Sequence, residues 1–248
     1  MGYEESRIEG RNAVLEAFRS GKTIDKLYVL DGCQDGPVKS IMREARKHDT
    51  IINYVAKERL DQLSETGKHQ GVIAVSAAYE YAEVEDILAA AEEKGEAPFI
   101  IILDGIEDPH NLGAIIRTAN QAGAHGVIIP KRRAVGLTPT VARTSAGAIN
   151  YTPVAKVTNI SNTMKELKDK GMWFVCADMD GTRMYDLDLT GPIGLVIGNE
   201  GEGVSPLAKK NCDMVASIPM KGDIDSLNAS VATGVLAYEI VRQRMIKG

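Results

Sequence analysis

Residues 99–103 read Phe-Ile-Ile-Ile-Leu, and the polar pair Asp104-Gly105 and an apolar helical stretch follow them directly. Five apolar residues in succession predict a strand covered on both faces, because a half-exposed strand would alternate with polar residues. The same composition recurs at residues 127–129, 173–176, 194–197 and 215–218, with helical stretches between them. We therefore expect an α/β domain built on a mostly parallel sheet with helices on both sides.

The first part of the chain shows a smaller alternation of helices and strands. The pattern predicts helices at residues 8–18, 37–48 and 57–64, and strands at 26–30, 51–55 and 72–75. Residues 79–97 carry one lysine and seven carboxylates, so the chain's net negative charge of −5 arises in this short segment. We expect a small α/β domain over residues 1–78, an acidic linker over 79–97 and a second domain over 98–248.

Composition excludes several classes of protein. With 44% hydrophobic and 25% charged residues, the chain is neither disordered nor fibrous. It has no apolar run long enough to span a membrane, and its acidic first residues predict no signal peptide. Three well-separated cysteines and four scattered histidines predict neither a disulfide framework nor a metal site. A cytoplasmic protein is expected.

Glycine and polar residues gather at the predicted carboxyl ends of three strands, in residues 104–119, 197–204 and 218–232. Ligands of open α/β sheets bind beyond these ends, so we expect the three loops to form one pocket that is rich in amides and poor in charge. Gly198, Gly201 and Gly203 do not have the spacing of a dinucleotide-binding loop, which argues against a nicotinamide-dependent dehydrogenase.

Side chains in these loops have both structural and functional interpretations. Asn111 is placed to cap the helix that follows the first strand, and Ser226 is placed to cap a final helix over residues 226–245. Arg117 emerges from an apolar stretch on a different helix face from Asn111. Such an arginine is either exposed to solvent or retained because it binds an anion.

The three loops, taken in order, resemble the motifs of the SpoU branch of the SPOUT RNA methyltransferases. The matching residues are Asp108-Pro109-His110-Asn111-Leu112-Gly113 with Arg117-Thr118-Ala119, then Ile197 to Gly203, then Ile218-Pro219-Met220 with Ser226 to Ala232. Residues 9–14 and 69–72 resemble parts of the family's L30e-like RNA-binding domain. The whole chain is similar to RlmB-type 23S rRNA guanosine 2′-O-methyltransferases.

This resemblance implies a fold, a cofactor and an assembly. The second domain would be an α/β trefoil knot, a topology that ordinary folding rules disfavour. The cofactor would be S-adenosylmethionine, held largely by backbone around Gly198, Ile218 and Leu227, and its binding residues would also include Glu200, Gly201, Met220 and Asn228. The protein would be a homodimer through its C-terminal domain, with the active site near the subunit interface.

The resemblance also implies the reaction and its residues. A methyl group would pass to the ribose 2′-hydroxyl of a guanosine in 23S rRNA, with catalytic roles for Arg117, Asn111, Glu200, Ser226 and Asn228. The family assigns proton removal to the arginine at position 117, but a guanidinium is essentially always charged, so phosphate binding and polarisation of the hydroxyl fit it better. Glu200 would hold ribose hydroxyls or pair with Arg117.

Basic residues suggest where RNA phosphates would bind. Lys131, Arg132 and Arg133 form the densest basic run, Arg143 lies one helix further on, and Arg11 belongs to the first domain. Aromatic residues make up only 5% of the chain, so base stacking on aromatic rings is not widespread. A tRNA guanosine substrate and a non-catalytic, ribosome-associated RNA-binding protein remain as alternatives.

Overall fold

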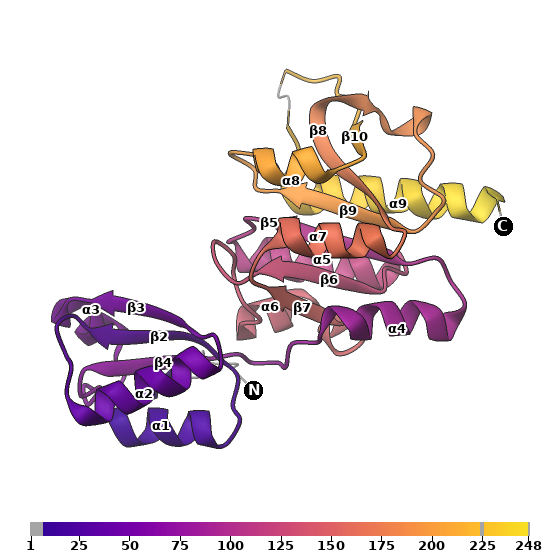
Figure 1. Cartoon of the computed structure of the whole chain (residues 1–248). Coiled ribbons are helices and arrows are strands. Elements are labelled where there is room, and N and C mark those ends of the chain that lie inside the picture. The colour runs from indigo at the N-terminus through magenta and orange to yellow at the C-terminus, as the bar shows by residue number, and fades with distance from the viewer. Residues whose placement is uncertain (1–6, 224–225, 248) are drawn as a thin grey trace. The chain divides into compact units, whose positions relative to one another are not determined.

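The chain forms two compact units (Figure 1), seen in a computed structural model that describes residues 7–223 and 226–247. The first unit comprises the chain up to Glu80 together with Gly136–Pro139, and the second comprises Tyr81–Val135 and the chain from Thr140. Residues 1–6, for which the sequence predicted no signal peptide, lie outside the described residues, as do Ile224 and Asp225 of the third predicted loop.

The first unit is a four-stranded sheet with helices packed on it. Its strand order is β1 (Arg7–Glu9), β4 (Val72–Ser76), β2 (Ile24–Leu30) and β3 (Ile51–Val55). β4 is antiparallel to both β1 and β2, whereas β3 is parallel to β2. The helices are α1 (Arg11–Arg19), α2 (Gly36–Lys47) and α3 (Lys57–Leu63), and the core contains apolar side chains of α1, α2, β2 and β4.

The start of this unit differs from the sequence prediction, which placed a single helix over residues 8–18. Ile8 and Glu9 are extended and pair with Ala74 and Ile73 of β4. Gly10 takes a φ of +87°, a conformation that turns the chain from the strand into α1 and that few other residues adopt. The predicted helix was therefore wrong in its first turn.

The second unit is built on a six-stranded sheet whose strands are all parallel. Their order is β10 (Met214–Ser217), β8 (Trp173–Arg183), β9 (Ile193–Gly198), β5 (Phe99–Asp104), β6 (Gly126–Pro130) and β7 (Val154–Val157). The predicted parallel sheet is confirmed, although β7 had not been predicted. The trefoil knot stays a prediction from the resemblance.

Helices cover both faces of this sheet, as Figure 1 shows. α4 (Val84–Lys94), α7 (Ile160–Asp169) and α8 (Pro206–Asn211) pack with one set of strand side chains, while α5 (Pro109–Gln121) and α9 (Ala229–Lys247) pack together on the other face. The short helices α6 (Pro139–Thr144), η1 (Ala148–Asn150) and η2 (Met184–Asp186) complete the unit. Among the described residues, no helix is both long and apolar enough to cross a membrane.

α4 lies inside the segment that the sequence predicted as an acidic linker. A capping box between Glu83 and Asp86 begins it, and Gly95 ends it with a left-handed φ of +66°. Its Ile87 is fully buried in the core with Ile100 and Ile128. The acidic charge therefore lies on the outer side of a helix that contributes to the second unit.

Two helical glycines of the second unit provide a matched pair for a stability test. A Cβ on Gly113 of α5 would lie 1.8 Å from Oγ1 of Thr144 and 2.9 Å from the carbonyl oxygen of Val141, whereas on Gly234 of α9 it would have no neighbour closer than 4.0 Å. We expect Gly113→Ala to lower the free energy of unfolding by about 1–3 kcal/mol. Gly234→Ala should raise it by about 0.5–1 kcal/mol. Denaturant unfolding of both variants checks this, and equal effects would contradict the close packing of α5 on α6.

Candidate active site

The N-terminal turn of α5 begins one residue after Asp108. The Asp108 carboxylate accepts a hydrogen bond from the amide of His110 at 2.8 Å, and Pro109 occupies the first helical position. The sequence had predicted Asn111 as the cap, which was wrong because the capping side chain is that of Asp108. Asn111 instead lies in the first turn, 6% exposed, with its side chain available for other contacts.

Three side chains from three separate loops meet in what we call the Glu200 cluster: Asn111, Glu200 and Asn228. Nδ2 of Asn111 donates to Oε1 of Glu200 at 2.7 Å, and Nδ2 of Asn228 donates to the same oxygen at 2.7 Å. Asn228 also donates to Oδ1 of Asn111 at 2.9 Å. The predicted convergence of the loops after β5, β9 and β10 is thus confirmed for these three residues.

Asn228 also caps the N-terminus of α9. Its Oδ1 accepts hydrogen bonds from the amides of Ser230 at 3.0 Å and Val231 at 3.4 Å, so it caps the helix. The sequence had predicted Ser226 as this cap, with the helix starting at residue 226. That was wrong because the helix begins at Ala229, and Ser226 lies exposed before it.

The loop after β9 carries Glu200 on a tight turn. Oδ1 of Asn199 accepts from the amides of Gly201 at 2.9 Å and Glu202 at 2.6 Å. A Cβ on Gly198 would lie 1.9 Å from the carbonyl carbon of Gly203, so this position has no room for a side chain. The glycine spacing therefore serves close packing of the loop on itself and fixes the place of Glu200.

Arg117 stands apart from the Glu200 cluster. It is exposed on α5 and forms no hydrogen bond or ion pair with any residue in the described part of the chain. Six residues of helix place its backbone about 9 Å along the axis from Asn111. Glu200 accepts from the two asparagines and is not paired with Arg117, so one of the two roles expected for Glu200 is absent within the chain.

The predicted RNA-binding cations occupy different surroundings. Arg132 and Arg133 are exposed after β6, beside the half-buried Lys131. Arg143 is exposed on α6, and the hydroxyl of the next residue, Thr144, donates to the carbonyl of Pro109 at 3.3 Å, so Arg143 adjoins the start of α5. Arg11, in the first unit, forms an ion pair with Asp35.

Two residues that sequence reasoning missed shape the site. Asn199 organises the turn that carries Glu200, and Oδ2 of Asp104 accepts from the amide of Ser205 at 2.9 Å, which ties the end of β5 to the start of α8. Asp104 is the last residue of β5 and Asn199 is the first after β9, and at such positions Asn and Asp commonly accept bonds from nearby amides. That position was the only signal in the sequence.

Comparison with known proteins identifies the chain. A model described as the SpoU rRNA Methylase family matches residues 98–238, and one described as RNA 2′-O ribose methyltransferase substrate binding matches residues 7–82. The chain belongs to the SpoU rRNA methylase family. It is 48% identical over 245 residues, 98% of each chain, to YacO of Bacillus subtilis, whose name carries a provisional assignment to the TrmH family of tRNA/rRNA methyltransferases.

Solved structures of SpoU-type enzymes share the fold. The SpoU methyltransferase AviRb from Streptomyces viridochromogenes, in complex with the cofactor AdoMet, matches with a TM-score of 0.62 at 28% identity, over 98% of this chain and 91% of that one. An AdoMet-bound rRNA methyltransferase from Sinorhizobium meliloti matches with a TM-score of 0.60 at 25% identity, over 95% and 86% of the two chains.

The family membership settles the class of reaction. The protein is an RNA 2′-O-ribose methyltransferase with an N-terminal substrate-binding domain and a C-terminal catalytic domain. It uses S-adenosylmethionine, the cofactor of the family. The loops suit this ligand: Ile218 and Leu227 are half-buried and Met220 is 39% exposed, so apolar surface remains open beside glycine-rich backbone. No group of side chains suited to a metal ion occurs in the described part of the chain.

Proposed function

We propose that this SpoU enzyme methylates the ribose 2′-hydroxyl of a guanosine in 23S rRNA, in the cytoplasm, as an RlmB-type enzyme. The observation that supports rRNA over tRNA is the separate first unit, which the substrate-binding model matches. The rRNA methyltransferase of S. meliloti matches 95% of this chain, whereas a tRNA modifying enzyme of Aquifex aeolicus (A. aeolicus TrmH/SpoU) matches 62%. The extra unit therefore accompanies the relative that is named for rRNA.

Mapping of 2′-O-methylated nucleotides in rRNA and tRNA tests this assignment. A strain without the gene should lack one methylated guanosine in 23S rRNA and retain all tRNA methylations, and the wild-type gene should restore the missing mark. Loss of a tRNA mark alone would establish the tRNA alternative. An unchanged map in both RNAs would favour a non-catalytic role in the ribosome.

The Glu200 cluster would orient the reacting ribose. Bound S-adenosylmethionine supplies an electrophilic methyl group. Asn111 and Asn228 both hold Oε1 of Glu200, and Oε2 has no partner within the described residues. In our proposal this second oxygen accepts the proton of the 2′-hydroxyl or fixes the ribose, while Ser226, exposed next to the cluster in sequence, orients the substrate. Arg117 binds the adjacent phosphate and polarises the hydroxyl.

The cofactor would lie against the three loops. Gly198 and Gly201 would contact it through their backbone, and Ile218, Met220 and Leu227 would provide the apolar surface for a purine base. Glu200 and Asn228 of the cluster would contact the part of the cofactor that faces the substrate. This arrangement brings donor and acceptor into line, which is the main requirement of a displacement at a methyl carbon.

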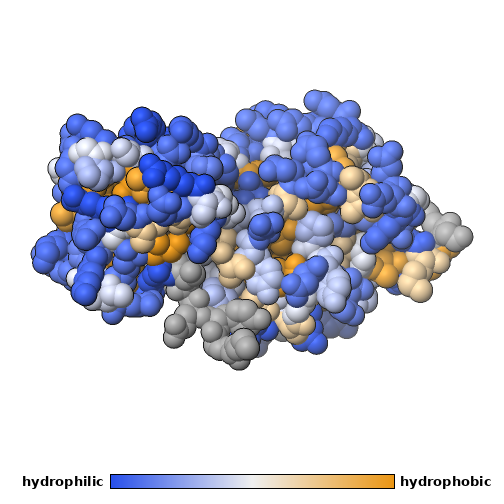
Figure 2. Space-filling model, turned by 90° about the horizontal axis from the view of Figure 1, so that it is seen from below, coloured by the Kyte–Doolittle hydropathy of each residue, from blue (hydrophilic) through white to orange (hydrophobic). Residues whose placement is uncertain are grey.

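A second copy of the chain would complete the site. Apolar side chains recur along α9 at the spacing of a packing seam, at Val231, Val235, Tyr238 and Met245. Of these, Val231 is 50% exposed, Tyr238 52% and Met245 78%. Figure 2 shows apolar side chains gathered at the C-terminal end of this helix. Thr118, next to Arg117, packs near Gly234, so Arg117 adjoins the seam. A two-fold dimer across this seam would bring Arg117 of one copy near its partner's cluster.

We expect Tyr238→Glu to convert the dimer to a monomer, because a charge in the middle of an apolar seam loses its hydration when two copies meet. Sedimentation at micromolar concentration measures the mass. Tyr54→Glu is the matched control, since Tyr54 has a similar exposure of 53% but lies in the first unit. A monomeric wild type, or a dimeric Tyr238→Glu, would contradict this interface.

RNA phosphates would be bound by Lys131, Arg132, Arg133 and Arg143, whereas Arg11, which is paired with Asp35, would contact the RNA in another way. We expect Arg132→Ala to weaken RNA binding and to lower the slope of log affinity against log salt by about one, because each phosphate contact releases about one counterion. Fluorescence anisotropy at several salt concentrations measures both quantities. An unchanged slope would remove Arg132 from the phosphate-binding surface.

A further inference from the structure

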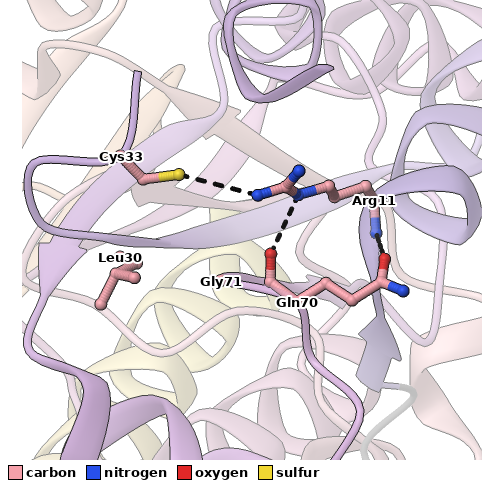
Figure 3. A pocket seen from close by; sticks show the side chains of 5 residues that line it. All are labelled: Arg11, Leu30, Cys33, Gln70 and Gly71. Carbon is pink, nitrogen blue, oxygen red and sulfur yellow. Dashed lines mark hydrogen bonds between the residues drawn. The ribbon is translucent and has the colours of Figure 1, made fainter. Parts of the chain in front are cut away.

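A cavity of about 460 Å³, open to solvent, lies in the first unit, whereas the Glu200 cluster belongs to the second. Arg11, Leu30, Cys33, Gln70 and Gly71 line it, and Figure 3 shows the guanidinium of Arg11 between Cys33 and the backbone of Gln70. Its size lies within the range of sites that bind small molecules, and it is sufficient for one nucleotide. The lining combines a planar cation, an amide, a thiol and an apolar wall.

The guanidinium of Arg11 is held rigidly and its charge is compensated. Its Nε donates to the carbonyl of Gln70 at 3.1 Å, and its Nη2 forms an ion pair with Asp35 at 2.5 Å. Nη2 also approaches Sγ of Cys33 at 3.9 Å. A cation that is paired and fixed in this way makes a poor mobile contact for phosphate. It presents a flat surface, however, of the kind on which unpaired bases stack in RNA-binding proteins.

The backbone around the cavity is held in an uncommon conformation. Gln70 has a φ of +50°, and its neighbour Gly71 has +82°. For a residue with a side chain, this conformation has an energetic cost and is often found at functional sites. Oε1 of Gln70 accepts from the amide of Arg11 at 3.1 Å, while its Nε2 has no partner among the described residues. Gln70 therefore holds a free donor at the rim of the cavity.

A carboxylate behind the loop fixes this conformation. Burial alone would raise the pKa of Glu9, but hydrogen bonds from the hydroxyls of Ser64 and Thr66 and from two backbone amides lower it to about 2. Glu9 therefore stays ionised near neutral pH and anchors the segment that leads to Gln70. The site is formed before any ligand arrives.

We propose that this cavity receives one unstacked base of the RNA substrate. The base would stack on the guanidinium of Arg11, lie against Leu30 and accept a hydrogen bond from Nε2 of Gln70. This inference rests on the proposed RNA substrate and adds base readout by the first unit to the phosphate contacts proposed for the second. Single-stranded, splayed nucleotides are the usual targets of such readout in RNA.

Protection of Cys33 from alkylation tests occupancy in the intact protein. The rate of iodoacetamide labelling at Cys33 is followed by peptide mass spectrometry and is normalised to the labelling of a small thiol added to the same mixture, because Cys176 is buried. We expect a 23S rRNA transcript, and millimolar nucleoside monophosphates, to slow labelling of Cys33 several-fold, whereas ribose 5-phosphate should not. Equal protection by ribose 5-phosphate would indicate a phosphate site. Protection by mononucleotides but not by RNA would indicate a free-nucleotide site, and either result overturns the proposal.

Filling the cavity tests its part in RNA binding. Leu30→Phe adds volume while retaining Arg11, Gln70 and Asp35, and we expect it to weaken rRNA binding about tenfold with an unchanged salt slope, as lost stacking of one base would. Leu63→Phe, at a half-buried leucine outside the cavity, is the matched control. Cys33→Met is a second filling variant in case Leu30→Phe fails to fold.

The outcomes separate this inference from the proposed function. Wild-type affinity in both filling variants would overturn the base site but leave the RNA methyltransferase intact, provided that Arg132→Ala still weakens binding. A reduced salt slope in Leu30→Phe would also overturn it, because the lost contact would then be ionic. If the wild-type protein binds no 23S rRNA at all, the proposed substrate itself fails.

Discussion

Arg117→Ala is expected to lower the single-turnover rate of methyl transfer by about 10²–10⁴-fold at saturating RNA and cofactor. The residue is exposed and without a partner among the described residues, so the fold and the affinity for S-adenosylmethionine should hardly change. The loss would arise because the 2′-hydroxyl is no longer oriented and polarised beside its phosphate. Rapid-quench methylation with labelled cofactor measures the rate, and calorimetry with S-adenosylhomocysteine measures cofactor binding.

Arg117→Lys separates the charge of the residue from the geometry of its guanidinium, because it keeps the positive charge. An ammonium is compact and lacks the planar fork that holds two oxygens together, so this variant should remain strongly impaired. Recovery by lysine would reduce Arg117 to a simple phosphate contact. Near-normal turnover by the alanine variant would remove Arg117 from the mechanism.

Glu200→Gln is expected to slow methyl transfer by about 100-fold or more. An amide keeps an oxygen that accepts from Asn111 and Asn228, so the cluster and the start of α9 should survive. It loses the second carboxylate oxygen, which we propose accepts the hydroxyl proton or fixes the ribose. Glu202→Gln is the matched control, since Glu202 lies exposed in the same loop. Equal effects of the two variants would indicate a general loss of negative charge.

Mixed dimers show whether the two residues act across the interface. If Arg117 and Glu200 of different copies form one site, a dimer of one Arg117→Ala chain and one Glu200→Gln chain contains one intact site. Mixing the two inactive variants should then restore activity. If both residues act within one copy, mixing restores nothing, and the proposed composite site is wrong.

The sequence predicted the second unit well because buried parallel strands have a clear signature. Phe99 to Leu103 and its counterparts are continuous apolar runs, and all of the predicted strands exist. β7 escaped notice because Val154–Val157 is short and contains Lys156, so it lacks that signature. The helix predicted over residues 8–18 failed at Gly10, since the left-handed φ that separates strand from helix follows from pairing with β4.

The site was predictable in its location and less so in its contacts. The convergence of three loops follows from the parallel sheet, and Asn111, Glu200 and Asn228 do meet. Which residue caps which helix did not follow, because Asp108 and Asn111, or Ser226 and Asn228, are equally good caps by residue type. The cavity at Arg11 was missed because its wall is formed by Gln70 and Gly71, far along the chain.

The strand order of the second unit has a consequence for biosynthesis. β5 is the first strand of that sheet to leave the ribosome, yet one of its two neighbours is β9, at Ile193–Gly198. One edge of β5 therefore stays unpaired until nearly the whole chain has been made, whereas all four strands of the first unit are made before residue 80. Substitutions in residues 193–198 should accordingly be more damaging to the yield of soluble protein during translation than to the stability of the finished enzyme.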